Sequence, residues 1–463
     1  RKRNLEIRIS YYFRKLLLFY VCVIVAAMSY HLTGNSNVAS LIAVVGVVYA
    51  IVKACNNEYL AIWVMFVLGS DIWGIVPYIN IGSGVLHWSD FNVIVAIFLC
   101  LRFIKVKARS RYGIVYSVML IFILIACVQS HSIYGQDVHT TLLTARELLV
   151  VISFWPIVKI VYSERITKNE FIDLVCKFTR WTMCIYWFEW ILVNMGFNIT
   201  FLQTGARWGT RIYIDPIFII LYFFINLYAV IYKREGYNST NKSIWNCIFS
   251  LLTFVIISQG RSGILYVVIT SVIMLLISLK PSKIIRFGIL GIALIACLVS
   301  VTQIREVVIS SFVESQSSDT GNIAYRIAEQ DYFENKLEGH ELFGVGIPNN
   351  HDARAVEYSG KTIDFESKKY NPYYLEDLGA FEIRYRFGII AYALYIVALA
   401  ISIIDAGFRR DKSVAAFAGM AFMVFMALNF NLLAYITARP FGFMISLILI
   451  EISAFNDEFI YIE

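Results

Sequence analysis

The chain has 463 residues, of which 59% are hydrophobic and 16% are charged, and its formal net charge is +7. Soluble domains usually carry about a quarter charged residues, so this composition excludes an ordinary soluble globular protein. Apolar stretches of roughly 16 to 24 residues follow one another, each long enough to cross a hydrocarbon core. The positive charge needs no nucleic-acid partner, because basic loops of a membrane protein meet anionic lipid. The sequence therefore predicts a polytopic, all-α membrane protein.

Basic residues are concentrated in alternate connectors between the apolar stretches. The connectors around residues 80–90 and 130–140 contain no Lys or Arg. The basic connectors contain Arg1, Lys2, Arg3, Arg14 and Lys15, then Arg102, Lys105, Lys107, Arg109 and Arg111, then Lys159, Arg165 and Lys168, then Lys233, Arg234 and Lys242, then Lys280, Lys283 and Arg286, and finally Arg409, Arg410 and Lys412. By the positive-inside rule these connectors and the N-terminus are expected to be cytoplasmic.

The apolar stretches predict about twelve to fourteen membrane spans, and fourteen fit them best. Residues 71–79 are interpreted either as the end of the third span or as a re-entrant segment. The expected spans are 16–33, 38–54, 59–79, 89–104, 112–130, 141–162, 179–197, 211–232, 243–259, 262–279, 284–302, 379–404, 413–437 and 440–455.

One connector, residues 303–378, is long enough to form a structure of its own, and the parity of the spans places it outside the cytoplasm. It is rich in polar and charged residues and contains a predicted helix at 323–338. Long ordered loops usually have a function, and the alternative is a solvated cap over the bundle. The chain is thereby divided into residues 1–302 with eleven spans, the extracytoplasmic loop 303–378, and residues 379–463 with three spans.

The residues that usually bind metals or nucleotides lack the spacing of a binding site. All eight Cys lie within or at the ends of predicted spans, where they are interpreted as small packing residues. The six His show no metal-ligand spacing with Cys, Asp or Glu. There is neither a phosphate-binding glycine loop ending in Lys-Ser or Lys-Thr nor an Asp-x-Asp pair. We therefore expect no metal, no other cofactor and no use of ATP.

Arginine is rare on the expected outer side, so each arginine there needs a reason beyond topology. Arg261 lies in the turn Ser258-Gln259-Gly260-Arg261-Ser262-Gly263, directly before an apolar span. A glycine-flanked turn at a helix N-terminus, beside a fixed cation, is typical of an anion site. The alternative is an arginine that snorkels to the lipid headgroups.

Other charged residues lie close to the membrane. Arg207 and Arg211 precede Asp215 and Pro216. These arginines are interpreted equally well as structural partners of Asp215 or as ligand-binding residues. At membrane depth, inside the bundle, we expect internal ion pairs among the charged side chains of Arg146, Glu147 and Glu189.

The order of several motifs between about residues 200 and 455 resembles the O-antigen ligase and polymerase superfamily, and Wzy-type polysaccharide polymerases in particular. The similarity comprises the turn at Arg261, an outer loop with Arg326 followed by Leu342-Phe343-Gly344-Val345-Gly346, and a helix start that leads into Gly388-Ile389-Ile390. The turn with Arg211, Asp215 and Pro216 also resembles those polymerases. The first half of the chain resembles them only in being helical and apolar.

The resemblance implies a fold of the GT-C type in the inner (plasma) membrane of a bacterium. It also implies a glycosyltransferase that polymerises repeat units linked to undecaprenyl pyrophosphate, without a metal. Arg261 and Arg326 are expected to hold the pyrophosphate, since two guanidinium groups can bind it bidentately. A chain-length regulator and a flippase are the partners that such an enzyme would have.

Ligases of this superfamily carry a His about eleven residues before the Gly that corresponds to Gly388, whereas this chain has Asp377 there. A carboxylate can accept the proton of a sugar hydroxyl, so Asp377 is the predicted general base, which favours a polymerase over a ligase. The alternative is that Asp377 caps the following helix. Other candidates for the base, or for contact with the substrate, are Glu376, Glu382, His340 and His351. The other activities considered are an O-antigen ligase, a flippase or transporter of lipid-linked oligosaccharide, and a peptidoglycan polymerase.

Overall fold

A computed structural model describes residues 14–81, 84–106, 110–197, 199–206, 209–232, 240–278, 322–350, 352–363, 370–428 and 438–454. The helices in these residues are α2 (Leu17–Thr33), α3 (Ser36–Cys55), α4 (Glu58–Gly69), α5 (Trp88–Arg102), α6 (Gly113–Tyr134), α7 (Val138–Ala145), α8 (Phe154–Tyr162), α9 (Lys168–Asn194), α10 (Ile217–Tyr232), α11 (Thr240–Thr253), α12 (Arg261–Ser278), α15 (Asn322–Leu337), α16 (Phe381–Gly407), α17 (Val414–Leu428) and α18 (Ala438–Ser453). Four short helical segments are η1 (Asp71–Gly74), η2 (Arg146–Ser153), η3 (Phe254–Ser258) and η4 (Leu375–Leu378). Three antiparallel hairpins are formed by β1 (Ile79–Ile81) with β2 (Gly84–Leu86), β3 (Thr204–Ala206) with β4 (Thr210–Ile212), and β5 (Lys361–Ile363) with β6 (Tyr370–Pro372).

The expected multi-pass helical architecture is confirmed. Four helices in the described part of the chain are long and apolar enough to cross a membrane: 36–55, 113–134, 240–258 and 381–407. A bent pair, 138–145 with 148–162, makes a fifth span if its two helices are counted together. Shorter apolar helices occupy other predicted spans, and the predicted span 284–302 lies outside the described residues.

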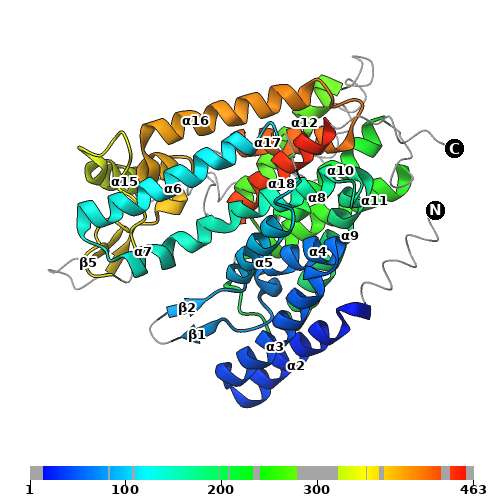
Figure 1. Cartoon of the computed structure of the whole chain (residues 1–463), viewed down its shortest axis with the longest axis horizontal. Coiled ribbons are helices and arrows are strands. Elements are labelled where there is room, and N and C mark those ends of the chain that lie inside the picture. Colours follow the sequence, from blue (N-terminus) through cyan, green and yellow to red (C-terminus); the bar gives the residue numbers. More distant parts are fainter. Residues whose placement is uncertain are drawn as a thin grey trace.

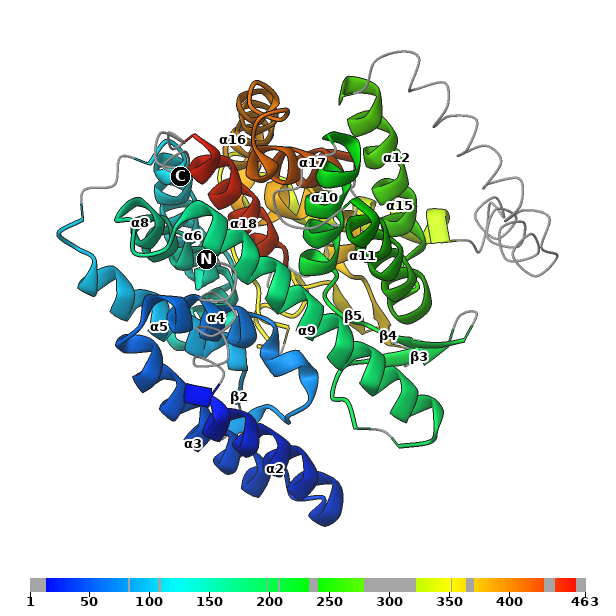
Figure 2. The ribbon, with the colours of Figure 1, turned by 90° about the vertical axis from the view of Figure 1, so that its right-hand side faces the viewer.

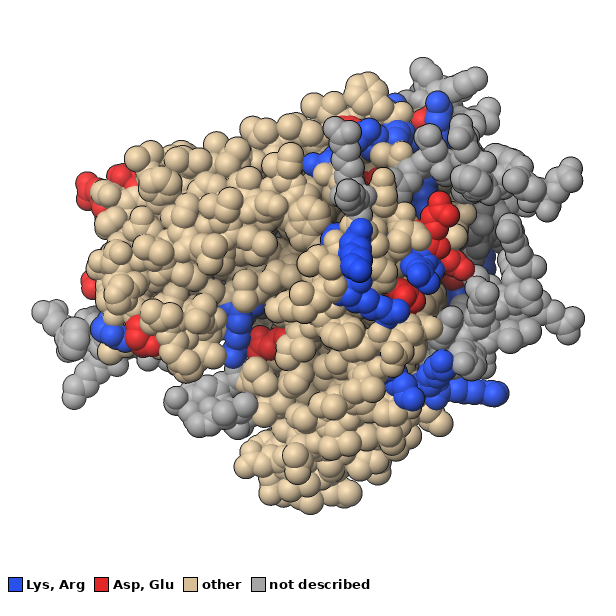
Figure 3. Space-filling model, in the orientation of Figure 1, with Lys and Arg blue, Asp and Glu red and all other residues tan. Residues whose placement is uncertain are grey.

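Helices α6 and α16 run side by side along the long axis of the molecule (Figure 1). The residues that follow α15 gather at one end of this bundle, which we call the loop end. At the opposite end lie the basic connectors after α5, α8 and α16, and we call it the basic end. On the face shown in Figure 3, most of the Lys and Arg side chains lie toward the basic end and a broad uncharged surface covers the middle.

Small side chains allow neighbouring helices to approach closely. The buried face of α3 includes Ala39, Ala43, Gly46, Ala50 and Ala54, and this face packs against α2. A Cβ added at Gly46 would lie 2.6 Å from the Cβ of Cys22. Small residues at such an interface are the usual way in which membrane helices pack, because lipid supplies no hydrophobic force between them.

The predicted third span, 59–79, is wrong in its second half. The helix ends at Gly69, and four consecutive residues, Asp71 to Gly74, then have φ between 47° and 70°. A left-handed turn of this kind cannot continue a right-handed helix. It is held in place from outside, because Trp73 Nε1 donates to Thr182 Oγ1 (2.9 Å) and Phe201 N donates to Gly74 O (2.7 Å). The re-entrant interpretation of residues 71–79 agrees better with this geometry.

The predicted helix at residues 323–338 is confirmed as α15. Its apolar side packs on η4 and on the first turns of α16 in a small core separate from that of the bundle, formed by Phe333, Leu337, Val345, Leu375, Leu378 and Tyr385. The described part of the long loop is therefore an ordered layer with its own hydrophobic contacts.

Candidate functional site at the loop end

Helix α16 is interrupted close to its start, at Gly388, which has φ 83° and ψ 176°. The segment of residues 341–346, which contains the Leu-Phe-Gly-Val-Gly motif, lies against this break. Three backbone hydrogen bonds join them: Val345 N to Tyr385 O (2.8 Å), Gly346 N to Arg386 O (3.1 Å) and Ile389 N to Glu341 O (2.8 Å). The segment thus supplies partners for backbone groups that the break in the helix would leave unpaired.

The glycines of this junction are required by the closeness of the backbones. A Cβ at Gly388 would lie 2.1 Å from Leu342 O, and one at Gly344, which has φ 75°, would lie 2.5 Å from the backbone of Arg386. A Cβ at Gly346 would lie 2.5 Å from Ser130 Oγ on α6. Only glycine leaves room for these contacts and adopts these φ values without strain.

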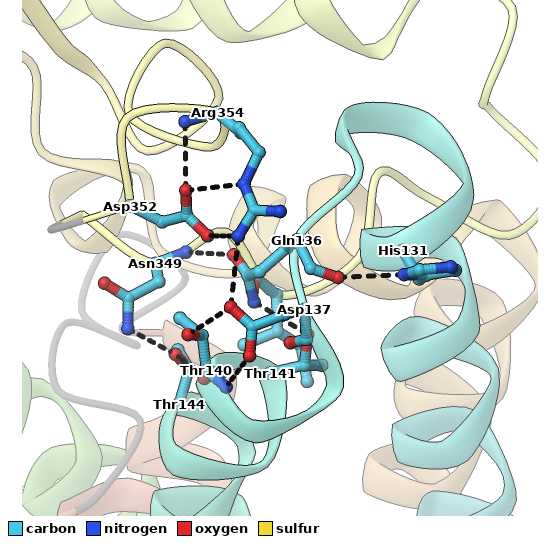
Figure 4. A network of polar contacts seen from close by, with 10 residues as sticks. His131, Gln136, Asp137, Thr140, Thr141, Thr144, Asn349, Asp352 and Arg354 are labelled. Atoms are coloured by element: carbon cyan, nitrogen blue, oxygen red, sulfur yellow. Dashed lines mark hydrogen bonds and ion pairs between the residues drawn. The ribbon is translucent and has the colours of Figure 1, made fainter.

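A polar network fastens the next part of the loop to the turn between α6 and α7 (Figure 4). The buried Gln136 donates from Nε2 to Ile347 O (3.2 Å) and accepts at Oε1 from Asn349 N (2.9 Å). Asn349 Nδ2 in turn donates to Thr144 Oγ1 on α7 (2.8 Å). Each polar group of Gln136 therefore has a partner, which makes the junction specific as well as tight.

At the rim of the same network, Arg354 forms ion pairs with Asp137 (3.0 Å) and Asp352 (2.8 Å). Hydrogen bonds from the Thr140 backbone amide and hydroxyl, together with Arg354, lower the pKa of Asp137 to about 2. Because Arg354 and Asp137 are about half exposed, the ion pair between them contributes little stability by itself.

Several of the expected catalytic residues lie in or beside this ordered layer. Arg326 is on α15 with an exposed side chain, and Asp377 and Glu376 are in η4, which packs on α15. The two elements are also joined by a hydrogen bond from Tyr374 N to Glu329 Oε1 (2.8 Å). The side chains of Asp377 and Glu376 are outside the described residues.

The proposed capping role of Asp377 is wrong for α16. This helix begins at Phe381, and the residue at its N-cap position is Ala380. Asp377 belongs to the preceding turn η4, before Gly379 changes the direction of the chain. His340 is half-buried in the turn after α15, where its amide donates to Leu337 O (2.8 Å), and His351 is outside the described residues.

A second group of expected site residues lies where the β3–β4 hairpin meets the start of α12. Arg211 on β4 donates from Nε to Ser258 O (2.7 Å), and its guanidinium carbon lies 3.8 Å from the centre of the Tyr213 ring. No described carboxylate lies within ion-pair distance of Arg211. The guanidinium is thus oriented by a carbonyl and an aromatic ring, with its charge not neutralised by a described acid.

The turn that precedes α12 is built for a close approach of the two elements. Gln259 adopts a left-handed conformation, with φ 50°, and donates from Nε2 to Thr210 O in the hairpin (3.1 Å). The helix starts directly afterwards, at Arg261, so its free N–H groups lie beside the hairpin that carries Arg211. The side chain of Arg261 and the whole of Arg207 are outside the described residues.

Asp215 accepts a hydrogen bond at Oδ1 from Ile217 N (3.0 Å), at the start of α10. Of the two arginines that the sequence offered as partners of Asp215, Arg211 does not pair with it, and Arg207 lies outside the described residues. Carboxylates at helix N-termini commonly accept hydrogen bonds from the first backbone amides. This contact of Asp215 is therefore explained by stabilisation of the start of α10 and needs no ligand.

Arg146 has an acidic partner that was not among those expected from the sequence. Arg146 Nε lies 3.4 Å from Asp90 Oδ1, on α5, whereas Glu189 is fully buried elsewhere on α9 and the side chain of Glu147 is outside the described residues. Burial and the Arg146 guanidinium lower the pKa of the neighbouring His87 to about 4. The sequence analysis did not consider Asp90, although it is a charged residue at the start of a predicted span. Its carboxylate also accepts a hydrogen bond from His87 N (2.9 Å).

Across the described ranges, no group of three or more His, Cys, Asp or Glu side chains is arranged to hold a metal ion. No protein-family model matches the chain, and no curated protein matches it either. Fold and geometry together define a multi-pass helical membrane protein with an ordered layer of loop at one end of its bundle.

Proposed function

We propose that this protein is a polysaccharide polymerase that transfers a glycan from a polyprenyl pyrophosphate to a sugar hydroxyl. The single observation that carries the proposal is the position of Arg211. Its guanidinium is held beside the N-terminus of α12, at a membrane end, and has no described acidic partner. A cation next to free helix N–H groups suits a multiply charged anion such as a pyrophosphate.

In the proposed reaction, the oxygen of the acceptor hydroxyl attacks the anomeric carbon of the donor glycan. The bond between that carbon and the pyrophosphate oxygen breaks, and the polyprenyl pyrophosphate leaves. Arg211 and Arg261 bind the pyrophosphate more strongly as negative charge develops on it, which lowers the barrier. Asp377 takes the proton of the hydroxyl, and Arg326 provides a third cation, from the loop layer.

The loop end is extracytoplasmic in this proposal, and the N-terminus is cytoplasmic, in the inner membrane of a bacterium. The distribution of basic connectors supports this orientation. The fold would be of the GT-C type, with the polyprenyl chain in lipid and the glycan in water. A flippase would deliver the lipid-linked repeat unit, and a chain-length regulator would be a natural partner.

Deletion of the gene, followed by electrophoresis of surface polysaccharide, tests the proposal. We expect a ladder of polymer to collapse to single repeat units, and plasmid-borne wild type to restore the ladder. The Arg211→Ala variant should fail to restore it, whereas Arg111→Ala should succeed, since Arg111 is at the basic end and already contacts Asp405 (3.3 Å).

Two other outcomes would identify the alternative activities. Loss of all polysaccharide-capped lipid, with polymer still present on its carrier, would identify a ligase. Accumulation of lipid-linked repeat units on the cytoplasmic side would identify a flippase. Either result would refute polymerisation.

A further inference from the structure

An apolar groove lies between α6 and α16, with a volume of about 280 Å³. Residues of η2, α17 and α18 form its floor, and Glu382, at the loop end, is the one charged side chain among the described residues that line it. The groove walls include Ile114 and Phe122 on α6 and Ile383, Ala391, Ala398 and Ile401 on α16. Such a lining suits a hydrocarbon chain and not a polar substrate.

The length of the groove indicates which kind of chain fits it. Ile383 and Ile401 both line it, on either side of the break at Gly388, and 18 residues at 1.5 Å per residue correspond to roughly 27 Å. A hydrocarbon core is about 30 Å thick, so one leaflet accounts for about 15 Å. The acyl chain of a phospholipid would fill only about half of the groove, whereas a long polyprenyl chain can follow it from end to end.

The loop end of the groove carries charge suited to the head of such a lipid. Glu382 is buried and pairs with Arg386 at 2.9 Å, which compensates its charge. Arg384 lies in the same turn, with a side chain that is 35% exposed and a contact of 3.8 Å to Glu334. This contact is too long for a strong hydrogen bond, so Arg384 can turn toward a phosphate group at the mouth of the groove.

The groove is separate from the Arg211 site. Figure 2 shows α6 and α16 on one side of the bundle, and α11, α12 and the β3–β4 hairpin on another. Polymerisation joins two lipid-linked molecules, and the Arg211 site would hold the donor. We propose that the groove between α6 and α16 binds the polyprenyl chain of the acceptor, an inference that rests on the proposed function.

The test uses the purified full-length protein and two synthetic substrates. The donor is a repeat unit on undecaprenyl pyrophosphate, blocked at its acceptor hydroxyl. The acceptor carries the same glycan on a non-cleavable phosphonate analogue, with either two or eleven isoprene units. For the wild type, we expect KM for the long acceptor to be lower by on the order of tenfold or more, because burial of hydrocarbon favours binding.

Two groove-filling variants, Ala391→Leu and Ala398→Phe, should lose this dependence on acceptor chain length. Both alanines are 9% exposed and line the groove. Ile390→Phe is the matched control, because Ile390 is on the same helix, 39% exposed and not part of the lining. The control should keep the wild-type ratio of KM values. Two results would overturn the proposal. One is a wild-type ratio of KM values for short and long acceptors in both groove variants, and the other is a KM that depends on the length of the donor chain and not on that of the acceptor chain.

A second measurement needs no variant. The long acceptor analogue with a diazirine in its terminal isoprene unit is irradiated with the wild-type protein, and the labelled peptides are identified. Label on α6 and α16 supports the proposal, whereas label confined to the lipid-exposed helices α2 and α3 overturns it. Absence of polymer from the wild type would refute the proposed function, while labelling would still report on the groove.

Discussion

Replacement of Gly388 by alanine tests the junction between the loop and α16 most directly. The φ value of 83° at Gly388 is strained for any other residue, at a cost of about 1–3 kcal/mol. The new Cβ would lie 2.1 Å from Leu342 O, so the segment 341–346 has to move away. Its hydrogen bonds with α16 then weaken or break, at about 1 kcal/mol each. The three bonds and the strain together give a cost of roughly 4–6 kcal/mol for forming the junction.

Hydrogen exchange at the amides of Val345, Gly346 and Ile389 measures this cost, because these amides make the three bonds. In Gly388→Ala we expect their exchange to accelerate by about 10³-fold or more, with amides in the middle of α6 unchanged. Gly339→Ala is the control: Gly339 has a similar φ of 82°, but a Cβ there would have no atom within 4 Å. It should cost only about 1–2 kcal/mol and leave the three amides protected. Wild-type protection of these amides in Gly388→Ala would refute the reasoning.

Three further predictions concern the charged residues. Arg261→Lys and Arg326→Lys should each lose about 2–4 kcal/mol of transition-state stabilisation, because an ammonium lacks the planar two-pronged contact; wild-type polymer length at equal protein level would contradict this. Asp377→Asn should slow polymerisation from synthetic lipid-linked units by roughly 10²- to 10⁴-fold if Asp377 is the base, and a wild-type rate would assign that role to another residue. The pKa of Asp137 is lower in the folded protein than in the unfolded chain, so its contribution to anchoring the loop is complete above about pH 4 and disappears as the pH falls toward 2. Limited proteolysis after residue 349 should therefore become faster over this range in the wild type. Asp137→Asn should show a smaller increase, because Asp352, the other acidic partner of Arg354, still titrates with a lowered pKa.

Hydrophobic length and loop charge predicted most of the helices, because a membrane helix must satisfy its own backbone and its length is set by the bilayer. The helix α15 was also predictable, from polar and apolar residues alternating along its surface. The end of α4 was predictable only as an alternative, because the apolar pattern continues through Ile72 and Trp73 and also fits an unbroken span. Their left-handed conformation depends on partners far along the chain, such as Thr182 and Phe201, which local sequence cannot reveal.

The sequence predicted that charged residues inside the bundle would form ion pairs, but it did not predict which residues would pair. A charge at membrane depth needs compensation, which identifies Arg146 as a paired residue. Its partner, Asp90, comes from a different helix, and the choice depends on how α5 packs against η2. The same reasoning applies to Arg211: the sequence offered Asp215 as a partner, but the hairpin directs the guanidinium to Ser258 O and the Tyr213 ring instead.

The glycine motifs and the arginines of the candidate site carry different information about function. Three glycines, Gly344, Gly346 and Gly388, lie where a Cβ would collide with a neighbouring segment. Any protein with this junction would need them, whatever its activity. Their presence therefore bears on the architecture of loop and helix and does not test the proposed activity. The guanidinium of Arg211 is different, because the fold needs only its Nε contact and leaves its charge without a described carboxylate. Substitutions at the glycines consequently test the fold, and substitutions at the arginines and Asp377 test the activity; a variant of Arg211 that folds normally but makes no polymer would separate the two.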